Sequence, residues 1–397
     1  MKIQRIRHLG FVFLVGFFLT FCLAQDTVKV GLVSPFSGPV GFLGQWMANS
    51  VQVEIDKLNA EGGLLGSQLE LVTRDDEANP AKSVEAVREF ISRENVSLVI
   101  GPSFSSNALA VKPILEQAGV IGMFPTAGAV ELLADDPTYI FRAQDSTALS
   151  AAELLRLASE RGLSSVAIFA PDDAFGQDYD EQFRALAPEY GLEYLGAEFF
   201  REDDQDLTPY AQRLKSTGAE NVVVPTGNSA LGAKAVVAID AVDFEPLITG
   251  ISGLQGYNFT ELAGDAAEGV TFVASYLGYP AEVSFEEMPA RYAEHVQMVL
   301  DEYGAVEGAS LNTYPGAALA GNALWLWAEA VEAAGTFDAD EVAAALETLD
   351  ISADESPSGS ATSFSPASHE PYGEGALFFY EWYKKDDGAS FGFREVE

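Results

Sequence analysis

Short apolar runs alternate with amphipathic segments along most of this chain, and this alternation constrains its fold more than any other feature. A run at 28–33 precedes a segment in which Met47, Val51 and Ile55 recur at the spacing of one helix face. Comparable apolar runs, each separated from the next by a helical segment, lie at 69–72, 96–100 and 120–124. Strands and helices that alternate in this way form parallel sheets with helices on both faces. The sequence therefore predicts an α/β fold with a doubly wound parallel sheet.

The alternation starts again after a helical segment at 148–159, which indicates a second unit of the same plan. Its predicted strands lie at 166–169, 194–199, 222–224, 247–248 and 270–273, and its predicted helices lie near 177–188, 208–216 and 229–240. Residues 289–349 are expected to be mostly helical, and a last strand-like run covers 376–383. At roughly 150 residues per domain, a chain of 397 residues also suggests two domains.

The first 24 residues predict export from the cytoplasm. Three basic residues precede an apolar run at 11–19, and Ala24 ends the segment before a polar start at Gln25. A basic start, a short apolar run and small residues before the cleavage point are typical of a secretory signal peptide. We therefore expect cleavage after Ala24 and a periplasmic or otherwise extracytoplasmic protein.

Two other roles for this segment remain open. The uncharged stretch 8–25 is long enough to anchor the chain in a membrane. Residues 19–22 resemble a bacterial lipobox, in which Cys22 would carry a lipid, although bulky Phe21 stands where a small residue is expected. Cys22 is the only cysteine of the chain, so no disulfide forms within it and its stability depends on its core.

The charge balance is strongly acidic. The chain has 22 basic and 60 acidic residues, a net charge of −38, and loss of the predicted signal peptide would leave 19 basic residues and a charge of −41. Such a surface repels nucleic-acid phosphates and anionic lipid headgroups, so we expect neither as a partner. The charge also suits high salt, where screening reduces the repulsion among acidic groups.

No motif for catalysis or metal binding is found in the sequence. The chain lacks the H-E-x-x-H, G-x-S-x-G, P-loop and G-x-G-x-x-G patterns. Two of its three histidines, His295 and His369, follow the predicted signal peptide, and we expect structural or surface roles for both. A secreted α/β enzyme is therefore the weaker hypothesis, and we expect no cofactor and no metal.

Four strand-to-helix turns carry the most information about function. They are rich in small and polar residues and lie at 34–39, 102–106, 125–128 and 171–176. Ligands of open α/β sheets bind at the carboxyl ends of strands, where helix starts offer unpaired N–H groups. Any single turn of this kind could serve only as a helix cap. Four of them in a chain without catalytic motifs predict a cleft that binds a ligand without transforming it.

Segments along nearly all of the chain after residue 25 also resemble those of a known family. The matching segments are 29–39, 59–66, 75–76, 99–102, 141–142, 175–176 and 268–270. They resemble the type I periplasmic binding proteins, and most closely the leucine/isoleucine/valine-binding branch that serves ABC importers. The resemblance implies two lobes, joined by three crossing strands, that close on a small solute. Lobe 1 would comprise 26–143 and 277–360, and lobe 2 would comprise 144–276 and 361–397.

The resemblance also assigns ligand contacts to individual positions. Ser105 falls on the family's serine that binds an amino-acid carboxylate, and Ala127 and Gly128 fall on backbone contacts in the next turn. Gly128 replaces a threonine, and Phe175 replaces a tyrosine while keeping its ring. Gly227 aligns near a tyrosine of the second lobe and offers no side chain.

Ser252 departs from the family in a way that affects the choice of ligand. Branched-chain amino-acid binders have a glutamate there that pairs with the ligand ammonium, and a buried ammonium without a counter-charge is costly. A small carboxylic acid or amide is therefore as well supported as an aliphatic amino acid. Asp145, Asp172 or Asp173 could instead supply the missing charge.

Phe104, Leu43 and Trp46 are the remaining candidates for the pocket wall, and Trp46 could equally pack on a helix face. Together these features predict a monomeric extracytoplasmic solute-binding protein that closes on its ligand. The resemblance implies delivery of that ligand to the membrane permease of an ABC importer. A ligand-sensing subunit of a chemoreceptor or signalling system is the alternative.

Overall fold

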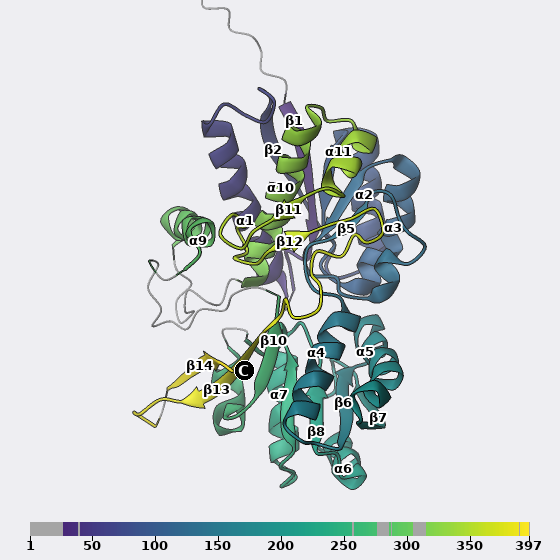
Figure 1. The fold of residues 1–397 in the computed structure, drawn as a ribbon, viewed down its shortest axis with the longest axis vertical. Helices are drawn as coiled ribbons and strands as arrows, with labels where there is room; N and C mark the ends of the chain where they lie inside the picture. Colours follow the sequence, from purple (N-terminus) through teal and green to yellow (C-terminus); the bar gives the residue numbers. More distant parts are fainter. Residues whose placement is uncertain are drawn as a thin grey trace, which may run out of the picture.

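The computed structural model describes residues 27–38, 40–255, 258–275, 286, 288–304, 315–388 and 390–396 (Figure 1). The predicted signal peptide, with Ala24 and Cys22, lies outside the described residues. Within the described ranges, no helix is both long enough and apolar enough to span a membrane.

Five parallel strands form the sheet of the first lobe, in the order β2-β1-β3-β4-β5. They are β1 (Thr27–Ser34), β2 (Gln68–Asp75), β3 (Leu98–Ile100), β4 (Ile121–Phe124) and β5 (Ile140–Arg142). Alternate side chains of β1 enter different cores. Val30 and Leu32 pack with α1 (Gly41–Ala60), whereas Val33 packs with α2 (Pro80–Glu89) and α3 (Ser105–Ala118). The doubly wound parallel sheet predicted for this half is therefore confirmed.

Three helices from later in the chain complete the first lobe. They are α9 (Ala290–Tyr303), α10 (Pro315–Ala334) and α11 (Ala339–Leu346). Leu324 and Trp327 of α10 share a buried core with Val51 of α1. The predicted helical region thus packs on the lobe formed by the start of the chain (Figure 1).

Seven strands form the sheet of the second lobe, in the order β14-β13-β10-β9-β8-β6-β7. The parallel strands are β6 (Ser165–Pro171), β7 (Glu193–Phe200), β8 (Asn221–Val224), β9 (Leu247–Ile251) and β10 (Thr271–Ala274). β13 (Phe378–Lys384) and β14 (Phe391–Glu395) form a hairpin that pairs antiparallel with β10. This hairpin adds two antiparallel strands to the parallel sheet that the sequence predicts.

Helices cover both faces of the second sheet. Side chains of α4 (Thr147–Glu160) and α5 (Ala174–Leu186) share one core with it. A separate core contains side chains of α6 (Thr208–Thr217), α7 (Ser229–Asp240) and α8 (Phe259–Ala263). The second lobe is therefore also doubly wound, as predicted.

The chain passes between the lobes at three places. The first passage is 143–146, between β5 and α4, and the second lies between β10 and α9. The third follows β12 (Thr362–Ser363), which pairs with β11 (Asp350–Ile351). Figure 1 shows the C-terminal part of the chain running from the upper, first lobe to the hairpin of the lower, second lobe.

The third passage begins later than residue 361, where the sequence places the start of the last lobe-2 segment. The rings of Phe364 and His369 still pack against Phe141 of β5, with centroid distances of 5.4 and 3.9 Å. Gly375 then donates its N–H to Glu153 of α4 (2.9 Å). We therefore propose that the C-terminal part of lobe 2 starts between residues 369 and 375.

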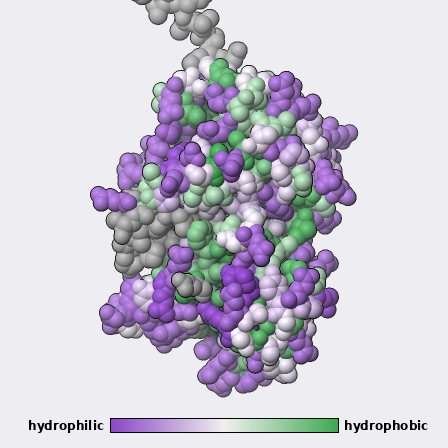
Figure 2. Space-filling model, in the orientation of Figure 1, coloured by the Kyte–Doolittle hydropathy of each residue, from purple (hydrophilic) through white to green (hydrophobic). Residues whose placement is uncertain are grey.

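Hydrophilic side chains cover much of both lobes on the face shown in Figure 2. Some acidic groups are paired: Glu94 lies 2.7 Å from Lys29 Nζ and 3.0 Å from Arg74 Nη2. Partly exposed ion pairs of this kind contribute little each. With 60 acidic residues and only 22 basic ones, most carboxylates cannot have a basic partner of their own.

Candidate ligand-binding site

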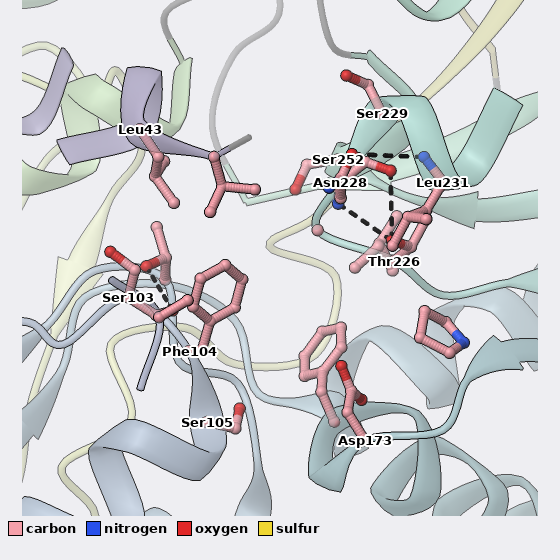
Figure 3. Close-up of a pocket in the computed structure, with 18 of the residues that line it drawn as sticks. Leu43, Ser103, Phe104, Ser105, Asp173, Thr226, Asn228, Ser229, Leu231 and Ser252 are labelled. Atoms are coloured by element: carbon pink, nitrogen blue, oxygen red, sulfur yellow. Dashed lines mark hydrogen bonds between the residues drawn. The ribbon is translucent and has the colours of Figure 1, made fainter. Parts of the chain in front are cut away.

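A cavity of about 310 Å³ lies between the lobes and is lined by turns that follow strands of both sheets. The first lobe contributes, among others, Leu43, Trp46, Ser103, Phe104 and Ser105, and the second lobe contributes Asp173, Phe175, Thr226, Gly227, Asn228, Leu231 and Ser252. Figure 3 shows the labelled residues of the two lobes on opposite sides of an open space. Segments that are far apart in the sequence therefore share one cavity.

Close backbone packing at the end of β3 positions the turn before α3. Gly101 has a φ of +85°, and a Cβ atom there would lie 2.2 Å from the carbonyl oxygen of Val33. Only glycine tolerates both this backbone conformation and this close approach. The hydroxyls of Ser34 and Ser103 are consequently 2.7 Å apart and hydrogen-bond across the two turns.

Ser105 is the first residue of α3 and is 4% exposed. Its Oγ accepts a hydrogen bond from the Ala129 N–H (3.2 Å), which leaves the hydroxyl proton available for a ligand. The N-cap residue of α3 is Phe104, and no side chain caps this helix. Ser105 is therefore not a helix cap, and the first-turn N–H groups, which lack partners within the helix, lie at the edge of the cavity.

Ala127 and Gly128 lie behind the cavity and are not among the residues that line it. Ala127 is fully buried, and its carbonyl oxygen accepts a hydrogen bond from Arg142. A second guanidinium nitrogen of Arg142 donates to the Ala129 carbonyl (2.9 Å). A Cβ atom on Gly128 would lie only 2.8 Å from Cε2 of Phe175. The Phe175 ring thus occupies the space where the resemblance expects a threonine side chain.

The second-lobe wall starts at the turn before α5. Asp173 is the N-cap residue of this helix and accepts a hydrogen bond from the Gly176 N–H (2.7 Å). A Cβ atom on Gly176 would lie 2.3 Å from the Pro171 carbonyl oxygen, so glycine lets the helix start against the end of β6. Burial raises the pKa of Asp173 above its ordinary value. Burial, and then repulsion by Asp173, raises the pKa of Glu202, which also lines the cavity.

Of the three aspartates considered as charge partners for a ligand, Asp173 alone lines the cavity. Asp172 accepts a hydrogen bond from the Gln177 side chain (2.9 Å) on the exposed side of the turn. Asp145 lies in the first passage between the lobes. Burial raises its pKa, although hydrogen bonds from Ser275 and Ser150 oppose this effect.

The turn after β8 contributes residues that the sequence argument missed. Thr226 Oγ1 accepts a hydrogen bond from the Asn228 N–H (3.0 Å). Asn228 in turn caps α7 by accepting from the N–H groups of Ala230 (3.0 Å) and Leu231 (3.3 Å) (Figure 3). The available signal was the polar segment 226–229 directly after an apolar strand, the same pattern as in the four turns selected.

Gly227 and Ser252 both reach the cavity, as the resemblance implies. A Cβ atom on Gly253 would lie 1.7 Å from the Thr226 carbonyl oxygen, so glycine allows the turn after β9 to pack against the turn after β8. The candidate residues Ser105, Phe104, Phe175, Ser252, Gly227 and Trp46 therefore meet in one cavity, whereas Ala127 and Gly128 support it from behind.

The side chains that line the cavity include both apolar and polar groups. The apolar groups include Phe42, Leu43, Trp46, Phe104, Phe175 and Leu231. The lining includes two carboxylates, Asp173 and Glu202, and among the described residues it includes no Lys, Arg or His. Two negative charges in the lining favour a ligand that carries a positively charged group, and they disfavour an anionic ligand without such a group.

A two-lobed α/β fold with a ligand-sized cavity between the lobes defines a class of proteins that enclose a small solute. Within this class, the chain belongs to the periplasmic binding protein family, whose sequence profile it matches over residues 27–388. The family consists of solute-binding proteins rather than enzymes, and membership implies an extracytoplasmic location.

Individual relatives support this assignment. The chain is 27% identical over 293 residues to the Leu/Ile/Val-binding protein BraC3 of Rhizobium johnstonii, which covers 72% of this chain and 78% of the relative. It shares its fold with a solute-binding protein of R. palustris in complex with 4-hydroxybenzoate (TM-score 0.78, 22% identity, 94% and 96% of the two chains). It also shares its fold with LivJ of Streptococcus pneumoniae in complex with isoleucine (TM-score 0.75, 21% identity, 94% and 100%). The resemblance inferred from the sequence is therefore confirmed.

Proposed function

We propose that this protein captures an amino acid with an apolar side chain between its lobes and delivers it, as a monomer, to the permease of an ABC importer. One observation carries the proposal. The Ser105 hydroxyl at the start of α3 lies on one side of the cavity, and the Asp173 carboxylate lies on the other (Figure 3). An amino-acid zwitterion needs hydrogen-bond donors for its carboxylate and a negative charge for its ammonium, and this cavity offers both.

The carboxylate of the ligand would bind at the start of α3. The Ser105 hydroxyl has a proton to donate, and the first-turn N–H groups carry the positive end of the helix dipole. No basic side chain is then needed among the residues that line the cavity. The same arrangement explains why Ser105 is held by Ala129 from behind, where the bond leaves its donor side free.

The ammonium of the ligand would bind on the second-lobe wall. Ser252 has no charge to offer there, but Asp173 lies in the same wall and uses one carboxylate oxygen, Oδ1, to cap α5. Its other oxygen can accept from an ammonium, and Glu202 adds a second negative charge. The ligand side chain would then lie among the rings of Trp46, Phe104 and Phe175. The Leu/Ile/Val-binding name of the relative BraC3 agrees with such a ligand.

A matched pair of ligands tests the proposal. L-leucine and 4-methylpentanoate have the same carboxylate and side chain, but the second lacks the ammonium. Calorimetry on the mature protein should show binding of L-leucine at least about tenfold tighter, because a hydrogen-bonded charge is lost with the amino group. Equal or tighter binding of 4-methylpentanoate would overturn the amino-acid assignment in favour of a plain carboxylate.

The variant Asp173→Asn tests the assigned residue. Asparagine caps helices as well as aspartate does, so the fold should be retained while the charge is removed. We expect affinity for L-leucine to fall about tenfold to a hundredfold, with little change in melting temperature. The control is Asp172→Asn, which removes a charge from the adjacent residue outside the cavity and should leave affinity within about twofold. Equal effects of the two variants would contradict a direct role for Asp173.

A further inference from the structure

The loop at 127–130 of the first lobe is the place where helix α5 of the second lobe makes contact behind the cavity. The Phe175 ring lies against Gly128, as the 2.8 Å approach to a Cβ atom at that position shows. One turn further along α5, Asp178 Oδ2 accepts a hydrogen bond from the Val130 N–H at 2.8 Å. Residues 175 and 178 are three positions apart, so both lie on the same face of the helix.

Asp178 joins groups from both lobes. The same Oδ2 also accepts a hydrogen bond from the Thr147 hydroxyl at the start of α4, and Oδ1 accepts from the Gln182 side chain (3.0 Å). The Thr147 N–H donates to the Gly128 carbonyl oxygen (2.9 Å). The Asp178 carboxylate therefore links helices α4 and α5 of the second lobe to a loop of the first lobe.

The same loop holds the ligand-facing serine. Ala129, the residue before Val130, donates its N–H to Ser105 Oγ (3.2 Å). Its carbonyl oxygen accepts a hydrogen bond from Arg142 (2.9 Å). A continuous series of contacts thus runs from Asp178 through Val130 and Ala129 to Ser105. Movement of α5 away from the loop would break the first of these contacts and withdraw Phe175 from the cavity wall.

We propose that Asp178 is a positioning residue that holds the two lobes in the arrangement seen here, which we call closed, in which both lobes line one cavity. Its bond to Val130 has a charged acceptor, and such bonds are stronger than neutral ones. Loss of the bond lowers the population of the closed arrangement, and apparent affinity falls in proportion to that population. The effect on lobe closure does not depend on which ligand the protein takes, whereas the effect on affinity rests on the proposed function.

The opening of the ligand-free protein is the direct test. The chain after residue 25 has no cysteine, so one cysteine can be introduced in each lobe, at exposed Glu85 and Gln212, for labelling with a fluorescent donor and acceptor. We expect Asp178→Ala to increase the inter-lobe distance and the radius of gyration of the ligand-free protein. Distances identical to those of the parent protein, in a folded variant, would overturn the proposal.

Two controls separate closure from packing within the second lobe. Asp180→Ala removes a carboxylate two residues further on, whose hydrogen bonds within the described part of the chain go to Arg184 and Tyr194 of the same lobe. Thr147→Val removes the hydroxyl that Asp178 binds in its own lobe and keeps the bond to Val130. Neither control should open the cleft. If Thr147→Val opens it as much as Asp178→Ala, Asp178 acts through second-lobe packing and the proposal fails.

The rate of ligand release provides a second test of the proposal. With L-leucine as the probe, Asp178→Ala should release ligand about tenfold faster, while the Asp180→Ala control keeps the parent rate. An unchanged release rate in a cleft that opens more readily would contradict the link between closure and retention. If the parent protein does not bind L-leucine at all, the proposed function fails, but the inter-lobe distances still decide the role of Asp178.

Discussion

The role of the Ser105 side chain depends on which groups surround it in the fold. The sequence places a serine at the start of a helix after a strand, and from this pattern it could serve as a cap or as a ligand contact. The structure separates the two roles, because α3 has no side-chain cap and Ser105 Oγ accepts instead from Ala129. A ligand contact is the role that we propose for its donor proton.

We therefore predict that Ser105→Ala lowers ligand affinity as well as stability. Loss of one hydrogen bond to a charged carboxylate should weaken binding of L-leucine about tenfold to a hundredfold. The unfolding free energy of the ligand-free protein should fall by about 1–3 kcal/mol, because the buried Ala129 N–H is left without its acceptor. Calorimetry and urea unfolding measure the two effects, and Ser92→Ala, an exposed serine that bonds the Arg88 carbonyl, is the control. Unchanged affinity with a large loss of stability would assign Ser105 a structural role.

For Gly128, the sequence could not predict whether the residue lines the cavity. The resemblance correctly locates the turn that contains it, but residue 128 does not line the cavity because the Phe175 ring lies in front of it. That ring comes from the other lobe, 47 positions later in the chain, and no local pattern predicts such a contact. For Asp173, the sequence did show a helix start after an apolar strand. It could not show that the Asp173 side chain lines the cavity.

At the scale of whole elements, the attachment of α9 depends on a buried polar cluster. Glu54 of α1 is 1% exposed and pairs with His295 and Arg291 of α9. His295 also hydrogen-bonds Ser50 Oγ through Nε2 (3.0 Å). His295 therefore has the structural role expected for it, because it joins two helices that are more than 200 residues apart in the sequence.

This cluster should make stability depend on pH. Burial by itself raises the pKa of Glu54, but hydrogen bonds and charge from His295 and Arg291 outweigh it and hold the pKa below the ordinary value of 4.5. The contribution of a lowered pKa is complete above the unfolded-state value and is lost as pH falls through the folded-state value. We predict that the unfolding free energy measured in urea declines below about pH 4.5.

The variant Glu54→Gln isolates this effect. It leaves the largely buried guanidinium of Arg291 without its carboxylate and should cost about 3–5 kcal/mol at neutral pH. Its difference from the parent protein should shrink as the solution is acidified, because protonation removes the same charge from the parent. A difference that stays constant down to acid pH would show that Glu54 is not ionised in the fold.

The elements themselves were largely predictable, and the exceptions have physical causes. β5 is three residues long, too short to give a period, and it was missed. α5 begins at residue 174 rather than near 177, because Asp173 caps it at that point. The antiparallel hairpin was read as one strand-like run, since pairing of β13 with β10 is decided by contacts about a hundred residues apart.

At the scale of the whole molecule, charge dominates. The mature chain that the sequence predicts would carry −41 with 19 basic residues, too few for each acidic group to have a basic partner of its own. Repulsion among these groups should destabilise the compact state at low ionic strength. We predict that the melting temperature rises from low salt to molar salt, equally in NaCl and KCl, because screening is not specific to the cation. A flat melting temperature would mean that the carboxylates are spaced widely enough to be independent.

The C-terminal hairpin bears on how this molecule is made. β10 of the second sheet pairs with β13, which lies about a hundred residues later in the chain, and the core around α1 includes Trp327 of α10. Neither lobe is a continuous stretch of sequence, so a growing polypeptide cannot finish the first lobe before α10, or the second before β13, has been synthesised. Long-range pairings of this kind slow folding and keep the two halves interdependent. A fragment that ends before residue 378 would therefore leave the sheet edge at β10 open, and the two lobes should be gained and lost together.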